Sequence, residues 1–132
     1  MSFATFVSDM TGLVVTGVRK RFDATPAQLS SAVLPAQYPR LAEVGGGVVS
    51  LTGSPGLFSG VCELVIVVKS VLQDNNTPNF DATVTLMSAL DTALRTSAAA
   101  GSGIDRWAIR QDVEPIGDTN YWIIVARIEA SG

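Results

Sequence analysis

The sequence predicts an α+β fold: a four-stranded, mostly antiparallel sheet with a long helix and a short N-terminal helix packed on one face. Residues 57–72 alternate between an apolar and a mixed face, which is the two-residue period of a strand. Apolar residues between Phe80 and Leu94 recur with the 3.6-residue spacing of an amphipathic helix. Strands, a helix and further strands follow one another through 132 residues with no linker. We therefore expect one domain spanning residues 1–132.

The N-terminal segment predicts a short helix that packs by one stripe. Ser2 is a suitable N-cap, and the helix should end near Gly12 or Leu13, because the β-branched run that follows disfavours a helix. The apolar residues of the stripe follow i, i+3, i+4 and i+7 spacing: Phe3, Phe6, Val7, Met10 and Val14.

Residues 17–39 are rich in proline and show little periodicity. Within them, Val18–Phe22 could form a short strand, and Thr25-Pro26 favours one turn of helix through Leu29. Pro35 and Pro39 force extended backbone on the residues before them. This segment should therefore not join the sheet fully.

The centre of the chain predicts two strands. Leu41–Thr52 is a candidate strand interrupted by Gly45-Gly46-Gly47, and residues 53–56 form a turn signal. Leu57–Leu72 is the clearest strand, with Cys62 on its apolar face and Glu63 on its mixed face.

The C-terminal half predicts the long helix and a closing pair of strands. The helix should run from Pro78 to Ala98, with Thr77 as its cap and Gly101 just past its end. Its core stripe should contain Phe80, Val84, Met87, Leu90 and Leu94. Strands around residues 106–113 and 121–128 should then be joined by a loop at 115–120.

The composition excludes several classes of function. The chain has no His, the commonest general base and metal ligand, and one Cys, so neither an intrachain disulfide nor a thiolate metal cluster can form. A net charge of −3 argues against general polyanion binding. No apolar run approaches the roughly 20 residues of a membrane span, and no signal peptide is recognisable. Only 16% of residues are charged, which favours exposed, weakly polar surface of the kind that forms interfaces.

The residues that could carry chemistry favour structural roles. Cys62 lies on an apolar strand face with no His to activate it, so we expect a buried, inert thiol. The glycine clusters lack the Lys-Ser/Thr of a phosphate loop. Asp112 and Glu114 share a strand parity but have no His or Cys beside them. We therefore predict no enzymatic activity, no cofactor and no metal.

The basic run Arg19-Lys20-Arg21 favours a solvated face or an interface ion pair. Contact with nucleic acid is the alternative, although three charges give little counterion release in an acidic chain.

The order of parts resembles the tail terminator proteins of long, non-contractile-tailed (siphovirus-type) bacteriophages. The specific residues of the resemblance lie in Gly17–Pro39, while the layout covers nearly the whole chain. In order, these residues are Gly17-Val18, Arg21-Phe22-Asp23, Pro26 with Leu29, Leu34-Pro35-Ala36 and Tyr38-Pro39.

The resemblance implies a homo-oligomeric ring, usually a hexamer, at the head-proximal end of the tail tube. Such a ring ends tube growth and joins the tail to the neck. Its partners would be other copies of the chain, the tail tube protein and the neck or head-completion protein, with DNA only passing through the lumen. It would be found in the virion tail at the neck, and in the host cytoplasm during assembly.

Alternatives remain. The chain could be a head-completion or other neck connector protein, a non-viral homo-oligomeric α+β binding module, or a small α+β enzyme or ligand-binding domain, although the absence of His and of any motif argues against the enzyme.

For the ring we predict interfaces built from sheet edges and from the segment 17–39. Residues 45–60 should form a hairpin that is mobile until a partner orders it, or else two strands of the sheet with a glycine bulge. The predicted interface residues are Arg19, Arg21, Phe22, Leu34, Tyr38, Val48, Val49, Leu51, Leu57, Phe58 and Tyr121.

Overall fold

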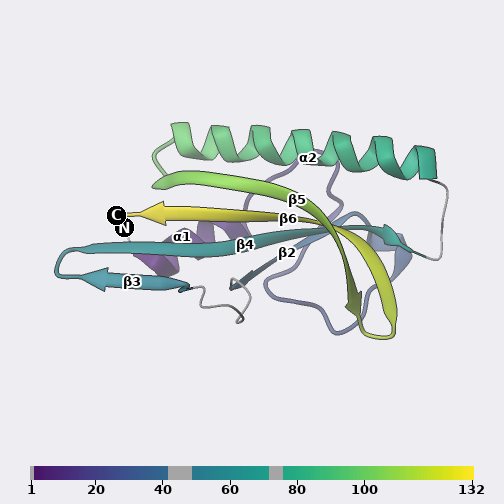
Figure 1. Cartoon of the computed structure of the whole chain (residues 1–132), viewed down its shortest axis with the longest axis horizontal. Coiled ribbons are helices and arrows are strands. Elements are labelled where there is room, and N and C mark those ends of the chain that lie inside the picture. Colours follow the sequence, from purple (N-terminus) through teal and green to yellow (C-terminus); the bar gives the residue numbers. More distant parts are fainter. Residues whose placement is uncertain (1, 42–48, 72–75) are drawn as a thin grey trace.

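A computed structural model describes residues 2–41, 49–71 and 76–132, with the backbone alone for residues 76–79. Two α-helices and six strands lie in this part of the chain, together with one short 3₁₀ helix (Figure 1). In chain order they are α1 (Phe3–Thr11), β1 (Lys20–Arg21), η1 (Ser31–Val33), β2 (Ala36–Leu41), β3 (Leu51–Ser54), β4 (Leu57–Ser70), α2 (Asn76–Ala99), β5 (Ile104–Ile116) and β6 (Thr119–Ser131).

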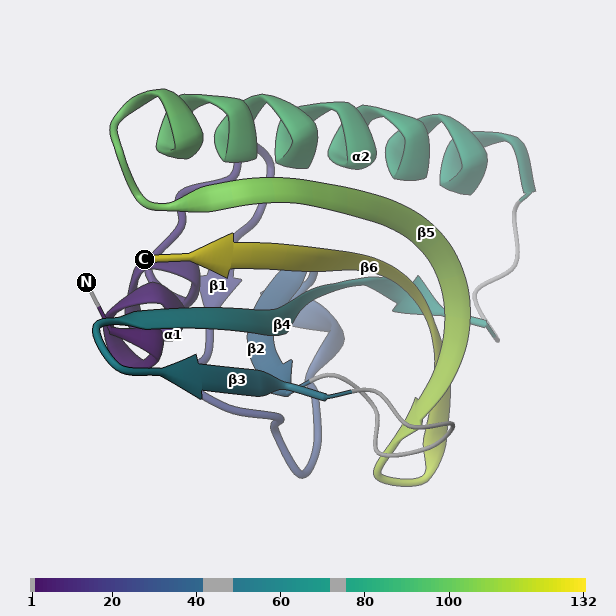
Figure 2. The same cartoon turned by 60° about the vertical axis from the view of Figure 1, so that its left-hand side comes forward.

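The sheet is six-stranded and mixed, so the prediction of four strands was wrong. Its strand order is β1-β2-β4-β6-β5, and β3 pairs with the first part of β4. The pair β1–β2 is parallel and the other pairs are antiparallel. β5 and β6 curve together toward the turn that joins them (Figure 2).

Two of the strands lie in or extend from the proline-rich segment. β1 falls within Val18–Phe22, where a short strand was one possibility, whereas β2 forms where we expected irregular backbone. β2 contains Pro39, which pairs opposite Leu64 of β4. The carbonyl of Gln37, two residues earlier, accepts a hydrogen bond from Phe22 N on the β1 side. The nitrogen of Pro39 points the same way, beyond the last residue of β1. Proline is tolerated there because, within the described residues, no neighbouring strand needs its missing N–H. The turn of helix expected at residues 25–29 is absent, and only η1 follows.

Both helices pack on one face of the sheet, as predicted. Ser2 caps α1, its Oγ accepting a hydrogen bond from Thr5 N. α2 begins at Asn76, one residue before the expected cap. The buried residues of this first core come from both helices, from β4 and β6, and from the loop after α1, which contributes Val15: Phe6, Met10, Val15, Cys62, Leu64, Ile66, Val68, Leu86, Leu90, Leu94, Ile124, Ala126, Ile128 and Ala130.

The predicted stripe of α2 was partly wrong. Leu90 and Leu94 are fully buried, but Phe80 and Val84 remain 66% and 48% exposed. The helix instead turns Thr83 and Leu86 inward in its first half. The two stripes are adjacent on the helix surface, and contact with the sheet selects between them.

The other face of the sheet is also a core, whereas we expected a mixed face. Val65 and Val67 of β4 are fully buried there, and Phe22 and Leu29 of the proline-rich segment pack against that cluster. The buried members are Leu34, Ala36, Tyr38, Val65, Val67, Ile116, Tyr121, Ile123 and Val125. The segment therefore serves as the cover of the second core.

Candidate interaction surfaces

The β3–β4 hairpin presents apolar side chains to solvent. Leu51 pairs opposite Gly60, and Ser54 pairs opposite Leu57 at the turn. Leu51 is 48% exposed, Leu57 66% and Val49, just before the hairpin, 63%. The outer edge of β3 pairs with no strand in the described part of the chain. An edge of this kind, carrying exposed leucines, is a surface suited to pairing with another chain.

Other residues near the hairpin have different positions. Phe58 is half-buried and packs edge-on against Phe3, with 6.5 Å between ring centroids. Val48 lies outside the described residues, as does the triplet Gly45–Gly47. Both strands of the hairpin belong to the sheet, while their mobility in the free subunit stays a prediction.

Three of the predicted interface residues are buried within the chain itself. Leu34, Tyr38 and Tyr121 are at most 8% exposed and belong to the second core. The hydroxyl of Tyr121 donates a hydrogen bond to the carbonyl of Leu29, 3.4 Å away. Phe22 is half-buried against the same cluster. Leu34, Tyr38 and Tyr121 are thus enclosed within their own subunit and offer almost no surface to a neighbour. Phe22 keeps part of its side chain exposed, and its place in an interface stays a prediction.

The basic run lies on and beside the terminal strand β1. Arg19, Lys20 and Arg21 are all exposed, and none of them forms an ion pair with a described acidic residue. Lys20 Nζ lies 5.6 Å from the centre of the Phe22 ring. Three cations that no described carboxylate neutralises therefore mark this edge of the sheet.

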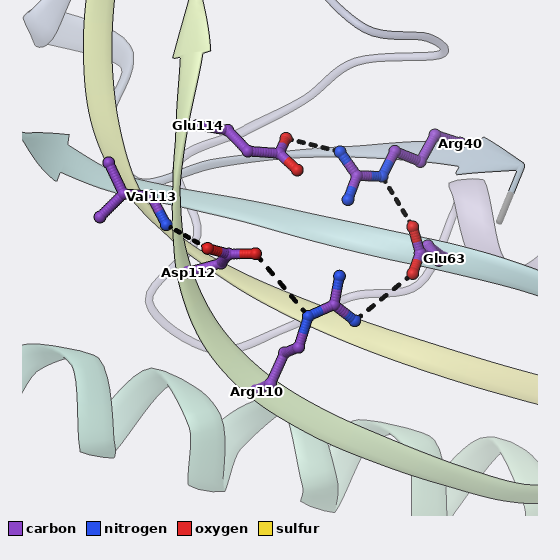
Figure 3. Close-up of polar contacts among 6 residues, drawn as sticks. All are labelled: Arg40, Glu63, Arg110, Asp112, Val113 and Glu114. Carbon is purple, nitrogen blue, oxygen red and sulfur yellow. Dashed lines mark hydrogen bonds and ion pairs between the residues drawn. The ribbon is translucent and has the colours of Figure 1, made fainter. Parts of the chain in front are cut away.

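A charged network spans the second face of the sheet beyond the apolar cluster (Figure 3). Arg40 on β2 donates from Nε to Glu63 Oε1 at 2.8 Å and from Nη1 to Glu114 Oε2 at 2.6 Å. Glu63 Oε2 also lies 3.5 Å from Arg110 Nη1 on β5. The network thus connects β2 to the edge strand β5 across the two strands between them, β4 and β6.

Burial makes the centre of this network sensitive to the loss of a partner. The side chain of Glu63 is 5% exposed and that of Arg40 is 17% exposed. Burial alone would disfavour the charged guanidinium, but the hydrogen bonds to Glu114 and Glu63 outweigh it and raise the pKa of Arg40 above its usual value. Nη2 of Arg40 is buried without a hydrogen-bond partner among the described residues.

The sequence contained a partial signal for this network. Glu63 interrupts the strongly apolar run Val61–Val68, and the shared parity of Asp112 and Glu114 was apparent from the sequence. Arg40 and Arg110 were not identified, because their pairing depends on which strands become neighbours.

Cys62 is the one cysteine among the described residues, and it is buried. No group of three or more His, Cys, Asp or Glu side chains suitable for a metal ion occurs among them. Burial raises the pKa of the Cys62 thiol to about 12, and the nearby Glu63 charge adds to the effect. A thiol with this pKa stays protonated near neutral pH and is a poor nucleophile. None of the described helices is long and apolar enough to cross a membrane.

No protein-family model matches this chain, and no curated protein sequence matches it.

Proposed function

We propose that this chain is a structural virion protein, a tail terminator subunit that forms a ring at the head-proximal end of a phage tail tube. In this role it ends tube growth and connects the tail to the neck. The proposal joins the sequence resemblance at residues 17–39 to one structural observation, the open edges of the sheet.

The open edges lie on opposite sides of the sheet, and this observation carries the proposal. β5 is the last strand on one side, with 13 residues whose outer edge pairs with no described strand. On the other side, the outer edges of β1 and β3 also pair with none of the described strands. Two different surfaces on opposite sides favour a head-to-tail contact, and such contacts produce closed rings when the rotation between copies closes.

The exposed leucines of the β3–β4 hairpin add apolar surface to the side of the sheet that carries β1 and β3. Leu51 lies on β3, which pairs with β4 on the same side as β2 does, and Leu57 is the first residue of β4. Burying them against a neighbouring subunit or the tail tube would remove apolar surface from water. Partners of the ring would be the tail tube protein and the neck protein, with DNA passing through the lumen without specific binding.

The test is the assembly state of the purified protein. We expect a discrete multiple of the chain mass by light scattering, ring-shaped particles by negative-stain microscopy, and shorter tubes when the rings are added to polymerising tail tube protein. Leu57→Ser should weaken assembly. Phe80→Ser is the matched control, because both side chains are 66% exposed but Phe80 lies on α2. A monomer at all concentrations, with no effect on tube length, would refute the proposal.

A further inference from the structure

The two ends of the sheet carry opposite charges in the same row of residues. Lys20 on β1 pairs opposite Ala36, which pairs opposite Val67 of β4. Val67 pairs opposite Ile123 of β6, which pairs opposite Asp112 of β5. Residues directly opposite one another project to the same face of a sheet. Lys20 and Asp112 therefore stand at the two ends of one row and project to one face.

Both charged groups are accessible. Lys20 is exposed and has no ion pair with a described acidic residue. The side chain of Asp112 is 48% exposed. Its Oδ1 accepts a hydrogen bond from Val113 N at 2.8 Å, and its Oδ2 lies 3.9 Å from Arg110 Nε (Figure 3). That arginine also contacts Glu63, so its charge is shared between two carboxylates.

The strand directions suit a contact between these two edges. β1 is parallel to β2, β2 is antiparallel to β4, and β4 and β5 are each antiparallel to β6. β1 therefore runs antiparallel to β5. A second copy placed edge to edge in the same orientation would bring its β1 beside β5 as an antiparallel pair, the more stable of the two pairings.

We propose that Lys20 of one subunit pairs with Asp112 of the next, across an antiparallel contact between the β1 edge and the β5 edge. This inference rests on the proposed ring, and it names the two surfaces that meet in it. The occupant of each edge is a second copy of this chain, because the chain carries both members of the charge pair at the correct ends of one row.

The charges also select the register of the contact. A slip by one residue would place Lys20 opposite Gln111 or Val113, which project to the other face. A slip by two residues would place it opposite Arg110, a like charge, or opposite Glu114, which is already held by Arg40 at 2.6 Å. Only the unslipped register therefore places Lys20 opposite a carboxylate on the same face, Asp112, that is not already held by Arg40.

Charge reversal tests the contact. We expect Lys20→Glu and Asp112→Lys each to raise the dissociation constant of the ring about tenfold or more, since an attraction becomes a repulsion. The double variant K20E/D112K should recover most of the assembly. Asp81→Lys, the same charge change on an exposed position of α2, should assemble like the wild type. Asp112→Asn keeps an acceptor for Val113 N and separates loss of charge from loss of that hydrogen bond.

Mixing the two single variants gives a second readout. A Lys20→Glu subunit can present its new carboxylate to the new lysine of an Asp112→Lys subunit, while the unchanged edges form the original pair. The mixture should then form rings of alternating subunits with an even copy number. Circular dichroism and the melting temperature of each variant verify that it is folded.

The outcomes distinguish the inference from the proposed function. Rings that form equally well in both single variants, or a double variant no better than the singles, would overturn the contact and leave the ring standing. A wild-type monomer would overturn both. Rescue by the double variant in an assembly other than a ring would support the contact and refute the tail terminator. Retention of double-stranded DNA that Lys20→Glu abolishes, with assembly unchanged, would assign the basic edge to nucleic acid instead.

Discussion

Removal of the Glu63 carboxylate should be one of the most destabilising single changes in the charged network. Glu63→Ala deletes the acceptor that contacts Arg40 Nε at 2.8 Å and Arg110 Nη1 at 3.5 Å. The side chain of Glu63 is 5% exposed and that of Arg40 is 17% exposed, so water cannot readily replace the lost partner. Breaking a buried ion pair by removing one member costs about 3–5 kcal/mol. Arg40 retains Glu114, so we expect a loss near the lower end, about 3 kcal/mol.

The chain supplies a matched control in an exposed ion pair. Arg106 and Glu129 pair across β5 and β6, with side chains 77% and 30% exposed. Glu129→Ala should cost no more than about 1 kcal/mol, because exposed pairs are screened and hold two flexible side chains. The double variant R40M/E63L removes both buried charges. It should recover most of the stability lost in Glu63→Ala, because replacing a buried ion pair by apolar side chains is often neutral or stabilising.

Urea unfolding followed by tryptophan fluorescence measures all three variants. The midpoint should fall for Glu63→Ala with the slope unchanged, which identifies a change in stability and not in the compactness of either state. Equal losses for Glu63→Ala and Glu129→Ala, or a double variant as unstable as the single, would refute the reasoning from burial.

Three further outcomes are expected. Leu90→Ala should cost about 2–5 kcal/mol of unfolding free energy, because Leu90 is fully buried. Phe80→Ala should cost no more than about 0.5 kcal/mol, because Phe80 is 66% exposed. Equal losses in urea titrations would contradict the assignment of Phe80 to the exposed side of α2. Cys62, whose thiol pKa is raised to about 12 by burial, should resist a thiol reagent at pH 8 and react once the chain is unfolded; rapid labelling of the folded protein would contradict this. Gly60→Ala should cost about 1–3 kcal/mol in thermal unfolding, because a Cβ there would overlap the Phe3 ring, and Phe3→Ala should make the same change less costly.

Local patterns in the sequence determined the elements whose residues carry their own signal. Ser2 caps α1 through a contact three residues away, and the alternation of β4 was readable from Leu57 onward. The closing strands were also predicted, although the turn between them is shorter than expected because Gly117 adopts a φ of 62°. In each case the preference depends on neighbours within a few residues along the chain.

The faces that these elements present were decided by the tertiary structure. α2 offers two adjacent stripes, one through Phe80 and Val84 and one through Thr83 and Leu86. Both stripes fit the period of a helix, so only the position of the sheet could select the second. The exposure of Phe80 is therefore a consequence of packing and not of local pattern.

Strand β2 and the pairing of charges also required the tertiary structure. Pro39 argues against a strand in the sequence, and it is accommodated because the end of β1 leaves that side of β2 open. Arg40 and Glu114 are 74 residues apart in the chain, and they meet because β2 and β5 belong to one sheet. Strand order, which sequence period does not encode, placed Lys20 and Asp112 at opposite ends of one row and made each edge a possible partner for the other.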